Sequence, residues 1–367
     1  MALGLNFGTG ADNDGETLFS AFTKINTILS TTTKLSNGDL QLNGVTIGKG
    51  NNTVSSNLVI GENAGNAITT GYQNLFIGSN SGKSTTTGFA NAFIGLSAGE
   101  FNSTGVYNLF LGVNAGRYNN STSNTLLGQG AGENSLGQGN TFVGQASNSS
   151  GTAGSYGTFV GQSAGFNNNG QSNTFVGQSS GYSNNTGFYH TFLGQNSGYN
   201  QSSGTGNTFL GFSAGTSSTS YSNATAVGNN AQPNASDTVT LGNGSIAALR
   251  CQVTVITGLS DARDKTDIIE ISEGLEFVDK LKPVTFTWNQ RDGNRIGAKA
   301  SGFIAQDLLE LQSESSIGEN LDLVSEANPE RLEARYSNLL PVLVKAIQEL
   351  SLEVKSLKSE IELLKAI

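Results

Sequence analysis

The central part of the chain repeats a short apolar segment that ends in glycine. The segment reads Asn-Leu-Phe-Ile-Gly at 74–78, Asn-Thr-Phe-Val-Gly at 140–144 and Asn-Thr-Phe-Leu-Gly at 207–211. Twelve closing glycines follow one another at intervals of 16 or 17 residues, with a last interval of 14: Gly61, Gly78, Gly95, Gly112, Gly128, Gly144, Gly161, Gly177, Gly194, Gly211, Gly228 and Gly242. A second glycine stands four residues after most of them. A period this short is too small for a pair of helices and predicts one coil of a β-solenoid per unit.

Each predicted coil has one apolar residue for its interior and another for its outside. The adjacent residues Phe159 and Val160 must point to opposite faces of a strand, as must the equivalent pair in the other units. We therefore expect one residue to fill the coil and the other to form an apolar stripe that needs a cover. Two further copies of the same chain are the simplest cover. Twelve coils at about 4.8 Å per coil give a shaft of about 55 to 60 Å.

Glycine and asparagine recur at fixed places in the coil. Glycine permits the positive φ angles and the close backbone approach that tight corners need. The recurring asparagines are expected to cap corners or to stack as a ladder of side-chain amides. They are Asn74, Asn91, Asn108, Asn124, Asn140, Asn173 and Asn207. His190 occupies the same place in its unit, which is best interpreted as a variant of the repeat; three copies meeting as a ring on a trimer axis is the alternative.

Helical periodicity is found at both ends of the chain. Near the N-terminus four apolar residues follow helical spacing: Leu18, Phe22, Ile25 and Leu29. Asp14 or Thr17 is placed to cap this short helix. Near the C-terminus apolar residues step by 3 and 4 in a heptad seam: Leu340, Leu343, Ile347, Leu350, Val354, Leu357, Ile361 and Leu364. Ile or Val at most a positions with Leu at d favours two strands, so the seam alone does not predict a trimer. Part of the seam is also able to pack against its own domain.

Charge divides the chain at Leu259–Ser260. The 367 residues carry 19 basic and 28 acidic side chains, a net charge of −9. Residues 49–259 hold four of each, whereas residues 260–367 hold 13 basic and 20 acidic side chains. We therefore predict an N-terminal segment at 1–48, a shaft at 49–259 and a separate domain at 260–367. The acidic balance argues against nucleic acid as a partner, because phosphate contacts need clustered Lys and Arg.

Composition argues against several further classes of protein. One cysteine, Cys251, leaves no intrachain disulfide, and a single histidine argues against a His-based metal site or a Ser-His-Asp triad. No apolar run approaches the roughly 18 residues of a membrane span, and the N-terminus lacks the basic flank and apolar core of a secretory signal. No cofactor is expected. The apolar stretch 251–256 is predicted to be a strand, and Trp288 is expected in the core of the C-terminal domain.

The repeat array resembles the glycine-rich repeats of trimeric fibre proteins, namely the heads of bacterial trimeric adhesins and the shafts of phage tail fibres. The stretch 8–26 resembles the opening of many phage fibre proteins, where the chain attaches to the virion; a small cap that closes the solenoid edge is the alternative. A calcium-binding nonapeptide solenoid fits poorly, because its repeat needs an Asp in each unit. An ice-binding threonine face stays open, with Thr at only one site per unit.

The segment after Leu259 carries the most specific motifs of the sequence. They are Ser260-Asp261-Ala262-Arg263-Asp264-Lys265, then Gly302-Phe303-Ile304-Ala305-Gln306, then Tyr336-Ser337-Asn338-Leu339-Leu340-Pro341, followed by the final helix. This order resembles the intramolecular chaperone domain of phage endosialidases, the S74 peptidase family, over essentially all of 260–367. The resemblance implies an α+β domain, ending in a long coiled-coil helix, that assembles the preceding fibre as a homotrimer and then cuts itself off.

The resemblance also implies roles for single residues. Ser260 would be the nucleophile, Lys265 the base and Leu259–Ser260 the scissile bond, while Asp261 and Arg263 would position the turn. A serine hydroxyl needs an adjacent base, and a lysine serves when burial favours its neutral form. Attack on the preceding carbonyl gives an ester that water then hydrolyses, and a single chain supplies the proximity. Outside the motif, the same serine and aspartate would be an ordinary helix cap and the lysine a solvated charge.

The predicted function is that of a structural phage fibre that contacts the host, with a chaperone domain that cleaves itself once, in cis. The expected partners are two further copies, other virion proteins through the N-terminus, and a glycan receptor on the host surface; the expected location is the virion, assembled in the host cytoplasm. One alternative is a trimeric fibre that stays uncleaved. Another is a polysaccharide-degrading spike, which needs paired carboxylates; the array offers Glu62, Glu100, Glu133 and Asp237. A cellular trimeric adhesin needs a secretion signal.

Several tyrosines are candidates for sugar stacking or for packing: Tyr107, Tyr118, Tyr182, Tyr189 and Tyr199.

Overall fold

The computed structural model describes residues 32–366 except 36–37, 51–55, 153, 216–218, 247, 253–256, 292 and 294. The chain forms two compact units, Met1–Leu241 and Gly242–Ile367. Residues 242–259 group with the second unit by their contacts, and the division at Leu259–Ser260 that charge indicates stays a prediction. The helix predicted at 18–29 lies outside the described residues.

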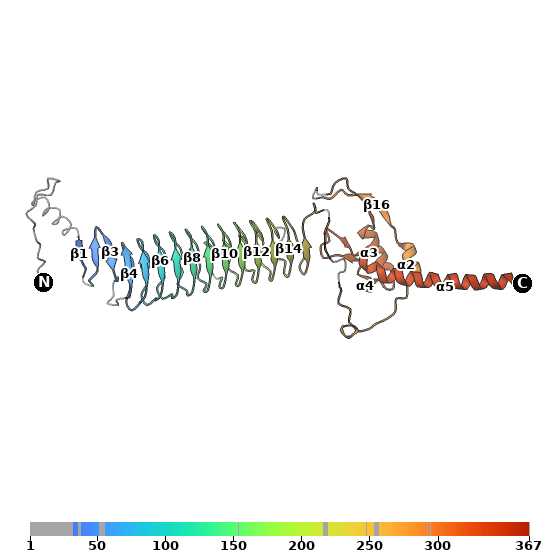
Figure 1. Ribbon diagram of the computed structural model, residues 1–367, viewed down its shortest axis with the longest axis horizontal. Coiled ribbons are helices and arrows are strands. Elements are labelled where there is room, and N and C mark those ends of the chain that lie inside the picture. The colour runs from blue at the N-terminus through green and yellow to red at the C-terminus, as the bar shows by residue number, and fades with distance from the viewer. Residues whose placement is uncertain are drawn as a thin grey trace, which may run out of the picture. The chain divides into compact units, whose positions relative to one another are not determined.

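The first unit is a single sheet that turns from antiparallel to parallel (Figure 1). It begins with β1 (Thr32–Lys34), β2 (Leu40–Leu42) and β3 (Val45–Gly48), which pair antiparallel. The parallel strands that follow are β4 (Leu58–Gly61), β5 (Leu75–Ile77), β6 (Ala92–Ile94), β7 (Leu109–Leu111), β8 (Thr125–Leu127), β9 (Thr141–Val143), β10 (Thr158–Val160), β11 (Thr174–Val176), β12 (Thr191–Leu193), β13 (Thr208–Leu210), β14 (Thr225–Val227) and β15 (Val239–Leu241). Each pairs only with its sequence neighbours, so these twelve strands bound eleven turns and the predicted β-solenoid is confirmed.

A column of aromatic rings fills the solenoid. The middle residue of each strand points inward, and in-register pairing sets Phe159 against Phe142 on one side and Phe175 on the other. These rings are buried and stacked, with centroids 4.7 and 4.8 Å apart. Leu126 interrupts the column between two such series. Each stacked pair contributes about 0.5–1.5 kcal/mol beyond the area that it buries, so the column is the main apolar core of the shaft.

Most coils have two glycines, which are needed for different reasons. Gly161, which closes its strand, has a φ of +140°, and a Cβ there would lie 2.5 Å from the carbonyl oxygen of Gly177 in the next coil. Gly165, four residues later, has a φ of +59°, and a Cβ there would lie 2.7 Å from the ring of Phe159. The first glycine therefore allows the coils to stack closely, and the second leaves room for the aromatic column.

A ladder of asparagine side chains runs beside the aromatic column, as the sequence predicts. The backbone N–H of Asn91 donates to Oδ1 of Asn74 at 3.1 Å, and that of Asn108 donates to Oδ1 of Asn91 at 3.0 Å. The amide nitrogen of Asn91 donates in turn to the carbonyl oxygen of Gly105, at 2.8 Å. Each buried amide thus satisfies backbone groups that the corner would otherwise leave without partners.

His190 occupies one position of this ladder. Its backbone N–H donates to Oδ1 of Asn173 at 2.9 Å, and its Nδ1 accepts from the backbone N–H of Asn207 at 3.1 Å. Its Nε2 is buried without a hydrogen-bond partner, and burial lowers the pKa of the ring to about 4. The alternative of three His190 rings meeting on a trimer axis is wrong, because the ring is enclosed within its own coil.

An apolar stripe runs along the outside of the strands. We use the name outer stripe for the third residue of each strand, which is Ile, Leu or Val in every parallel strand. Its members are Ile60, Ile77, Ile94, Leu111, Leu127, Val143, Val160, Val176, Leu193, Leu210, Val227 and Leu241. Each is half-buried or exposed in the single chain, so the stripe predicted from the alternation is present.

The second unit is a small α+β domain that ends in a long helix. Its elements are the 3-10 turn η1 (Ala262–Asp264), α2 (Leu275–Lys280), β16 (Val284–Thr287), β17 (Lys299–Gly302), α3 (Ala305–Glu314), α4 (Gly318–Leu321), β18 (Val324–Ser325), β19 (Glu333–Ala334), the 3-10 turn η2 (Tyr336–Leu339) and α5 (Leu340–Lys365). Phe277 of α2, Leu308 of α3 and Val342 of α5 meet in its core. At Gly274 a Cβ would lie 2.6 Å from the backbone of Ala346, so this glycine lets α2 approach α5.

Two expectations for the C-terminal part need correction. Trp288 is only half-buried rather than part of the core; its ring packs edge-on against Phe286, and the Arg295 guanidinium lies 4.8 Å above it. Cys251 is exposed and outside any strand. Gln252 is exposed and also outside any strand, and residues 253–256 of the predicted strand lie outside the described residues.

Replacing His190 by Asn should remove an acid sensitivity from the shaft. The folded chain keeps the ring neutral down to about pH 4, whereas the unfolded chain takes up a proton near pH 6.5. Stability of the wild type should therefore fall as the pH drops from about 6.5 toward 4, by on the order of 3 kcal/mol per chain. Guanidinium midpoints at pH 7 and pH 5 should differ more for the wild type than for His190→Asn. An equal shift in both proteins would contradict this account.

Candidate functional site

The residues of the predicted cleavage site lie on one tight turn. Asp261 caps η1, its Oδ1 accepting the backbone N–H of Arg263 at 2.9 Å. The turn folds the chain back on itself, so that Nζ of Lys265 lies 2.6 Å from Oγ of Ser260. The same Nζ also donates to the carbonyl oxygen of Ser260 at 3.4 Å. The structure thus brings together the two residues that the motif pairs as nucleophile and base.

An ion pair fixes the shape of this turn. The guanidinium of Arg263 contacts the Asp261 carboxylate from two nitrogens, with Nη2 at 2.6 Å and Nε at 3.1 Å. These side-chain bonds, and then the backbone bond, hold the pKa of Asp261 below its usual range, and the carboxylate raises the pKa of Arg263. Both side chains face solvent, so the pair adds little to global stability. Its geometric effect is to orient Ser260 and Lys265 toward each other.

The reactive groups of the turn are open to solvent in the single chain. Leu259, Ser260 and Lys265 are all exposed, and Leu259 is fully so. In this geometry the Lys265 amine donates to the serine hydroxyl instead of accepting its proton. The arrangement therefore has the connectivity of a Ser-Lys pair without the burial that would make the amine a base.

A carboxylate that the sequence did not single out joins two parts of the domain. Glu273 lies just before α2 and accepts hydrogen bonds from Oγ of Ser315 at 2.9 Å, from the backbone N–H of Ser316 at 3.1 Å, and from Oγ of Ser316. The bonds from Ser316 and then Ser315 lower the pKa of Glu273. This clamp ties the chain that leads from the cleavage site to the turn between α3 and α4. No local sequence pattern indicates this contact, because the partners of Glu273 lie 42 and 43 residues away.

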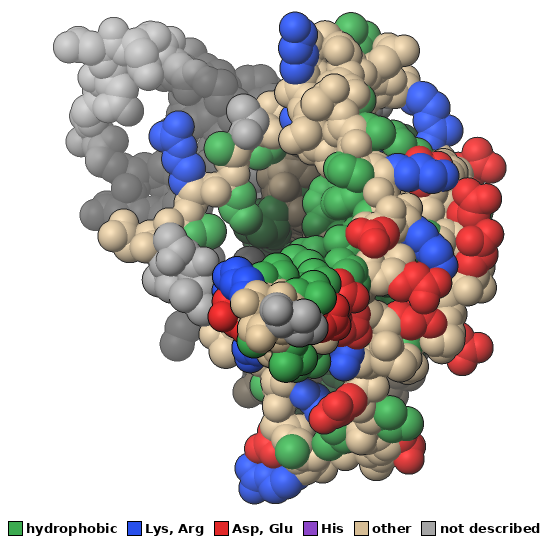
Figure 2. All heavy atoms as spheres, turned by 90° about the vertical axis from the view of Figure 1, so that its right-hand side faces the viewer, with side chains coloured by type: hydrophobic (Ala, Val, Ile, Leu, Met, Phe, Trp, Pro, Cys, Tyr) green, Lys and Arg blue, Asp and Glu red, His purple; other side chains and the backbone are tan. Residues whose placement is uncertain are grey.

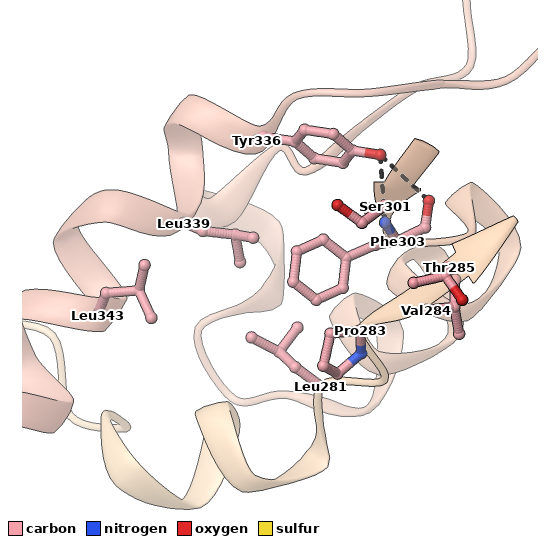
Figure 3. A pocket seen from close by; sticks show the side chains of 10 residues that line it. Leu281, Pro283, Val284, Thr285, Ser301, Phe303, Tyr336, Leu339 and Leu343 are labelled. Carbon is pink, nitrogen blue, oxygen red and sulfur yellow. Dashed lines mark hydrogen bonds between the residues drawn. The ribbon is translucent and has the colours of Figure 1, made fainter. Parts of the chain in front are cut away.

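An apolar pocket lies beside the start of α5 (Figure 3). It has a volume of about 660 Å³ and is lined mainly by Leu281, Pro283, Phe303, Leu339 and Leu343. At its edge, the hydroxyl of Tyr336 bonds to the backbone N–H and carbonyl oxygen of Phe303, each at 3.2 Å. Leu343 belongs both to this pocket and to the heptad seam, so the two apolar surfaces are continuous.

The heptad seam of α5 has no cover in the single chain. Its eight residues are between 39 and 71% exposed. The side of α5 that packs on its own domain carries Val342 and Ala346, which are buried and lie off the seam. Figure 2 shows hydrophobic side chains gathered beside the end of α5. Apart from Leu343, which lines the pocket with residues of its own domain, the seam therefore remains uncovered by that domain.

Comparison with protein families agrees with this geometry. Residues 260–316 match the Peptidase S74 family, described as chaperone of endosialidase. The match begins at Ser260 and includes η1, α2, β16, β17 and α3. It confirms the resemblance over these residues, which are about one sixth of the chain. No curated protein and no solved structure matches the chain.

The described residues offer little support for other kinds of site. No three of their His, Cys, Asp or Glu side chains come together as a metal site would require. Within the same residues, no helix is long and apolar enough to cross a membrane. Of the carboxylates considered for a polysaccharide-degrading spike, Glu100 is buried and paired with Nε of Arg117 at 2.9 Å and with Lys83 at 3.9 Å. A glutamate so engaged is unsuited to acid–base catalysis on a sugar.

Replacing Glu273 by Gln should loosen the turn between α3 and α4 at neutral pH. Hydrogen bonds to a charged acceptor are worth more than neutral ones, so we expect the amide of Ser316 to exchange about tenfold faster in the variant. Because the pKa of Glu273 is lowered, its contribution is present at neutral pH and lost as the pH falls through the folded value. Hydrogen exchange of the full chain measures this. Glu270→Gln, at an exposed glutamate three residues earlier, is the control and should leave Ser316 unchanged.

Proposed function

We propose that the chain is a homotrimeric fibre of a phage virion, and that residues 260–367 assemble its shaft and then cleave the Leu259–Ser260 bond. One observation carries the proposal: the match to the endosialidase chaperone begins at Ser260, where Lys265 is already in hydrogen-bond contact with the serine hydroxyl. The solenoid that precedes it is the kind of repeat such a chaperone would have to align.

The solenoid explains why a chaperone is useful. Its coils are nearly identical, so three chains can associate one coil out of register while losing few contacts. A domain that trimerises first would hold the three chains in register and raise their local concentration. The three shafts would then associate coil by coil from the C-terminal end, and the outer stripe of each chain would be covered by its neighbours.

The seam of α5 supplies the contact that begins assembly. Its residue pattern is compatible with two strands as well as three, so the trimer rests on the family resemblance and on the outer stripe. Packing of three α5 helices would also bring the apolar pocket at Leu343 against a neighbouring chain.

Cleavage would follow assembly, because assembly can bury the Ser260–Lys265 pair. Once neutral, the Lys265 amine accepts the hydroxyl proton as Oγ attacks the carbonyl carbon of Leu259. The C–N bond breaks, the proton passes to the amine of Ser260, and an ester joins Leu259 to Oγ. Water then hydrolyses the ester to leave the Leu259 carboxylate and a free serine hydroxyl. Loss of the template would trap the shaft kinetically, since unfolding cannot retrace folding.

The remaining parts of the proposal concern location and partners. The N-terminal segment would attach the fibre to other virion proteins, and the shaft would contact a glycan on the host surface. Assembly would take place in the host cytoplasm. No cofactor and no nucleic acid take part in this scheme.

Purified wild-type protein should consist of two fragments divided at Leu259–Ser260. Ser260→Ala and Lys265→Gln should each remain full length, with cleavage reduced at least a thousandfold, because each removes one half of the nucleophile–base pair. Intact mass under denaturing conditions measures this. Ser272→Ala and Lys282→Gln, at exposed positions of the same domain, are matched controls and should be cut normally. A wild-type protein that stays full length would contradict self-cleavage and would leave the alternative of a trimeric fibre that is not cut.

Cleavage should also depend on assembly through α5. Ile361→Asp puts a charge in the seam and should abolish both trimer formation and cleavage, because the pair at Ser260 then stays exposed. Lys355→Asp changes charge off the seam and should preserve both. Sedimentation and a denaturing gel on the same samples measure the two properties. A monomeric Ile361→Asp protein that still cleaves itself would show that the single chain suffices.

A further inference from the structure

The outer stripe is flanked by one further column of side chains on each side. The first residue of each strand faces outward together with the third, which belongs to the outer stripe. We use the name leading column for these first residues in β4–β14, and trailing column for the residues two positions after the stripe. The leading column is Leu58, Leu75, Ala92, Leu109, Thr125, Thr141, Thr158, Thr174, Thr191, Thr208 and Thr225, and the trailing column is Glu62, Ser79, Leu96, Val113, Gln129, Gln145, Gln162, Gln178, Gln195, Phe212 and Asn229.

The backbone ladder of the sheet continues as far as the trailing column. The N–H of Gly144 donates to the carbonyl oxygen of Leu127 at 2.8 Å, and that of Ala146 donates to the carbonyl oxygen of Gln129 at 2.9 Å. All five glutamines of the column are exposed. The outer face of the shaft therefore has three columns, with the apolar stripe between the leading and the trailing one.

The two flanking columns change character between the same two strands. In β6 and β7 both are apolar, with Ala92 and Leu109 leading and Leu96 and Val113 trailing. In each of β8–β12 the leading residue is threonine and the trailing residue is glutamine. The match is confined to β6–β12, because β4, β5 and β13 combine an apolar residue in one column with a polar residue in the other.

Contact within one chain does not explain why the columns match. The leading and trailing residues of a coil are four positions apart along an extended segment, which spans about 13 Å, and the outer stripe lies between them. Side chains at this separation do not meet. Their common change between β7 and β8 therefore indicates that each column has a partner outside its own chain.

Both halves of this face are suited to a further contact. Leu96, Leu109 and Val113 are between 39 and 49% exposed. In the polar half, Nε2 of Gln145 donates to Oε1 of Gln129 at 3.3 Å, and Nε2 of Gln162 donates to Oε1 of Gln145 at 3.2 Å. A primary amide has two N–H groups and two acceptor positions, so the ladder engages only half of what Gln145 offers.

A parallel copy of the chain has the matching chemistry. In a cyclic assembly one edge of each chain contacts the opposite edge of the next chain, at the same height. The leading column of one chain then meets the trailing column of its neighbour, so that threonine meets glutamine and Leu109 meets Val113. In an antiparallel pair the leading column would meet another leading column, and nothing would link its character to that of the trailing column.

We propose that the leading column of one chain packs against the trailing column of the next along β6–β12, with threonine hydroxyls hydrogen-bonded to glutamine amides in β8–β12. The change between β7 and β8 sets the register of the chains. A slip by one coil places Leu109 against Gln129 of the neighbour, or Thr125 against its Val113, and leaves a polar group without a partner. This contact rests on the homotrimer of the proposed function and names the surface that joins its shafts.

Disulfide trapping in the full chain tests the contact and its register. All variants carry Cys251→Ser, which removes the native thiol. Thr158→Cys combined with Gln162→Cys should give covalent trimers on a non-reducing denaturing gel after mild oxidation. The bond must join two chains, because a disulfide requires Cα atoms within about 7 Å and these two positions are about 13 Å apart in one chain.

A pair that is one coil out of register is the matched control. Thr158→Cys combined with Gln178→Cys should cross-link at least tenfold less, and Thr158→Cys alone should give no covalent dimer. Sedimentation of the reduced proteins should show the same assembly for every variant as for the wild type.

The outcomes separate this contact from the assembly on which it rests. Equal cross-linking of the two pairs would overturn the register, and cross-linking of Thr158→Cys alone would overturn the parallel arrangement. A trimer that does not cross-link through Thr158→Cys and Gln162→Cys would show that the shafts meet through another face. A wild-type protein that sediments as a monomer would instead overturn the homotrimer of the proposed function, and this contact with it.

Discussion

The shaft depends on one constraint, which is that every group turned inward must find its partner in the coil above or below. A coil of 16 or 17 residues is too thin to enclose a core of its own. Phe159 is therefore buried only because Phe142 and Phe175 cover its two faces, and the amide of Asn91 is satisfied by side-chain and backbone groups of the adjacent coils. The stability of each coil therefore depends on its contacts with the two coils next to it, as in other repeat proteins.

The same constraint accounts for the uneven chemistry of the chain. Like charges stacked at one coil spacing would repel, and the few charges of the shaft are arranged accordingly: Lys83, Glu100 and Arg117 follow one another in successive coils with alternating sign. Neutral groups stack without this difficulty, as the amide chain from Gln129 through Gln145 to Gln162 shows. Nearly identical coils therefore stack well within one chain. Between chains, the same similarity allows more than one register.

Features that repeat or that lie within a short motif could be predicted from the sequence, whereas single contacts between distant residues could not. The period, the inward Phe and the Asn ladder each recur many times, so their spacing alone indicates strand, face and partner. The clamp of Glu273 on Ser315 and Ser316 joins residues more than 40 positions apart, and no local pattern marks it. Trp288 was misplaced for a related reason: its size suggests a core, but the neighbouring Arg295 stacks on it near the surface. The pairing of Ser260 with Lys265 follows from a short turn, whereas the reactivity proposed for it would depend on burial that a single chain lacks.

Exposure of the Ser260–Lys265 pair fits the proposed order of events, in which the shaft assembles before the Leu259–Ser260 bond is cut. A dyad buried within one chain would cut before the shaft had registered, and the template would be lost with the fibre unfinished. Placing the pair on a solvent-facing turn, held in shape by Asp261 and Arg263, keeps the geometry ready while the lysine remains solvated. The uncovered seam of α5 lies in the same domain, so in the proposed trimer the contacts between chains would also be the ones able to remove water from the pair. Under the proposed function, the free energy of assembly, rather than a separate regulator, would control when the bond is cut.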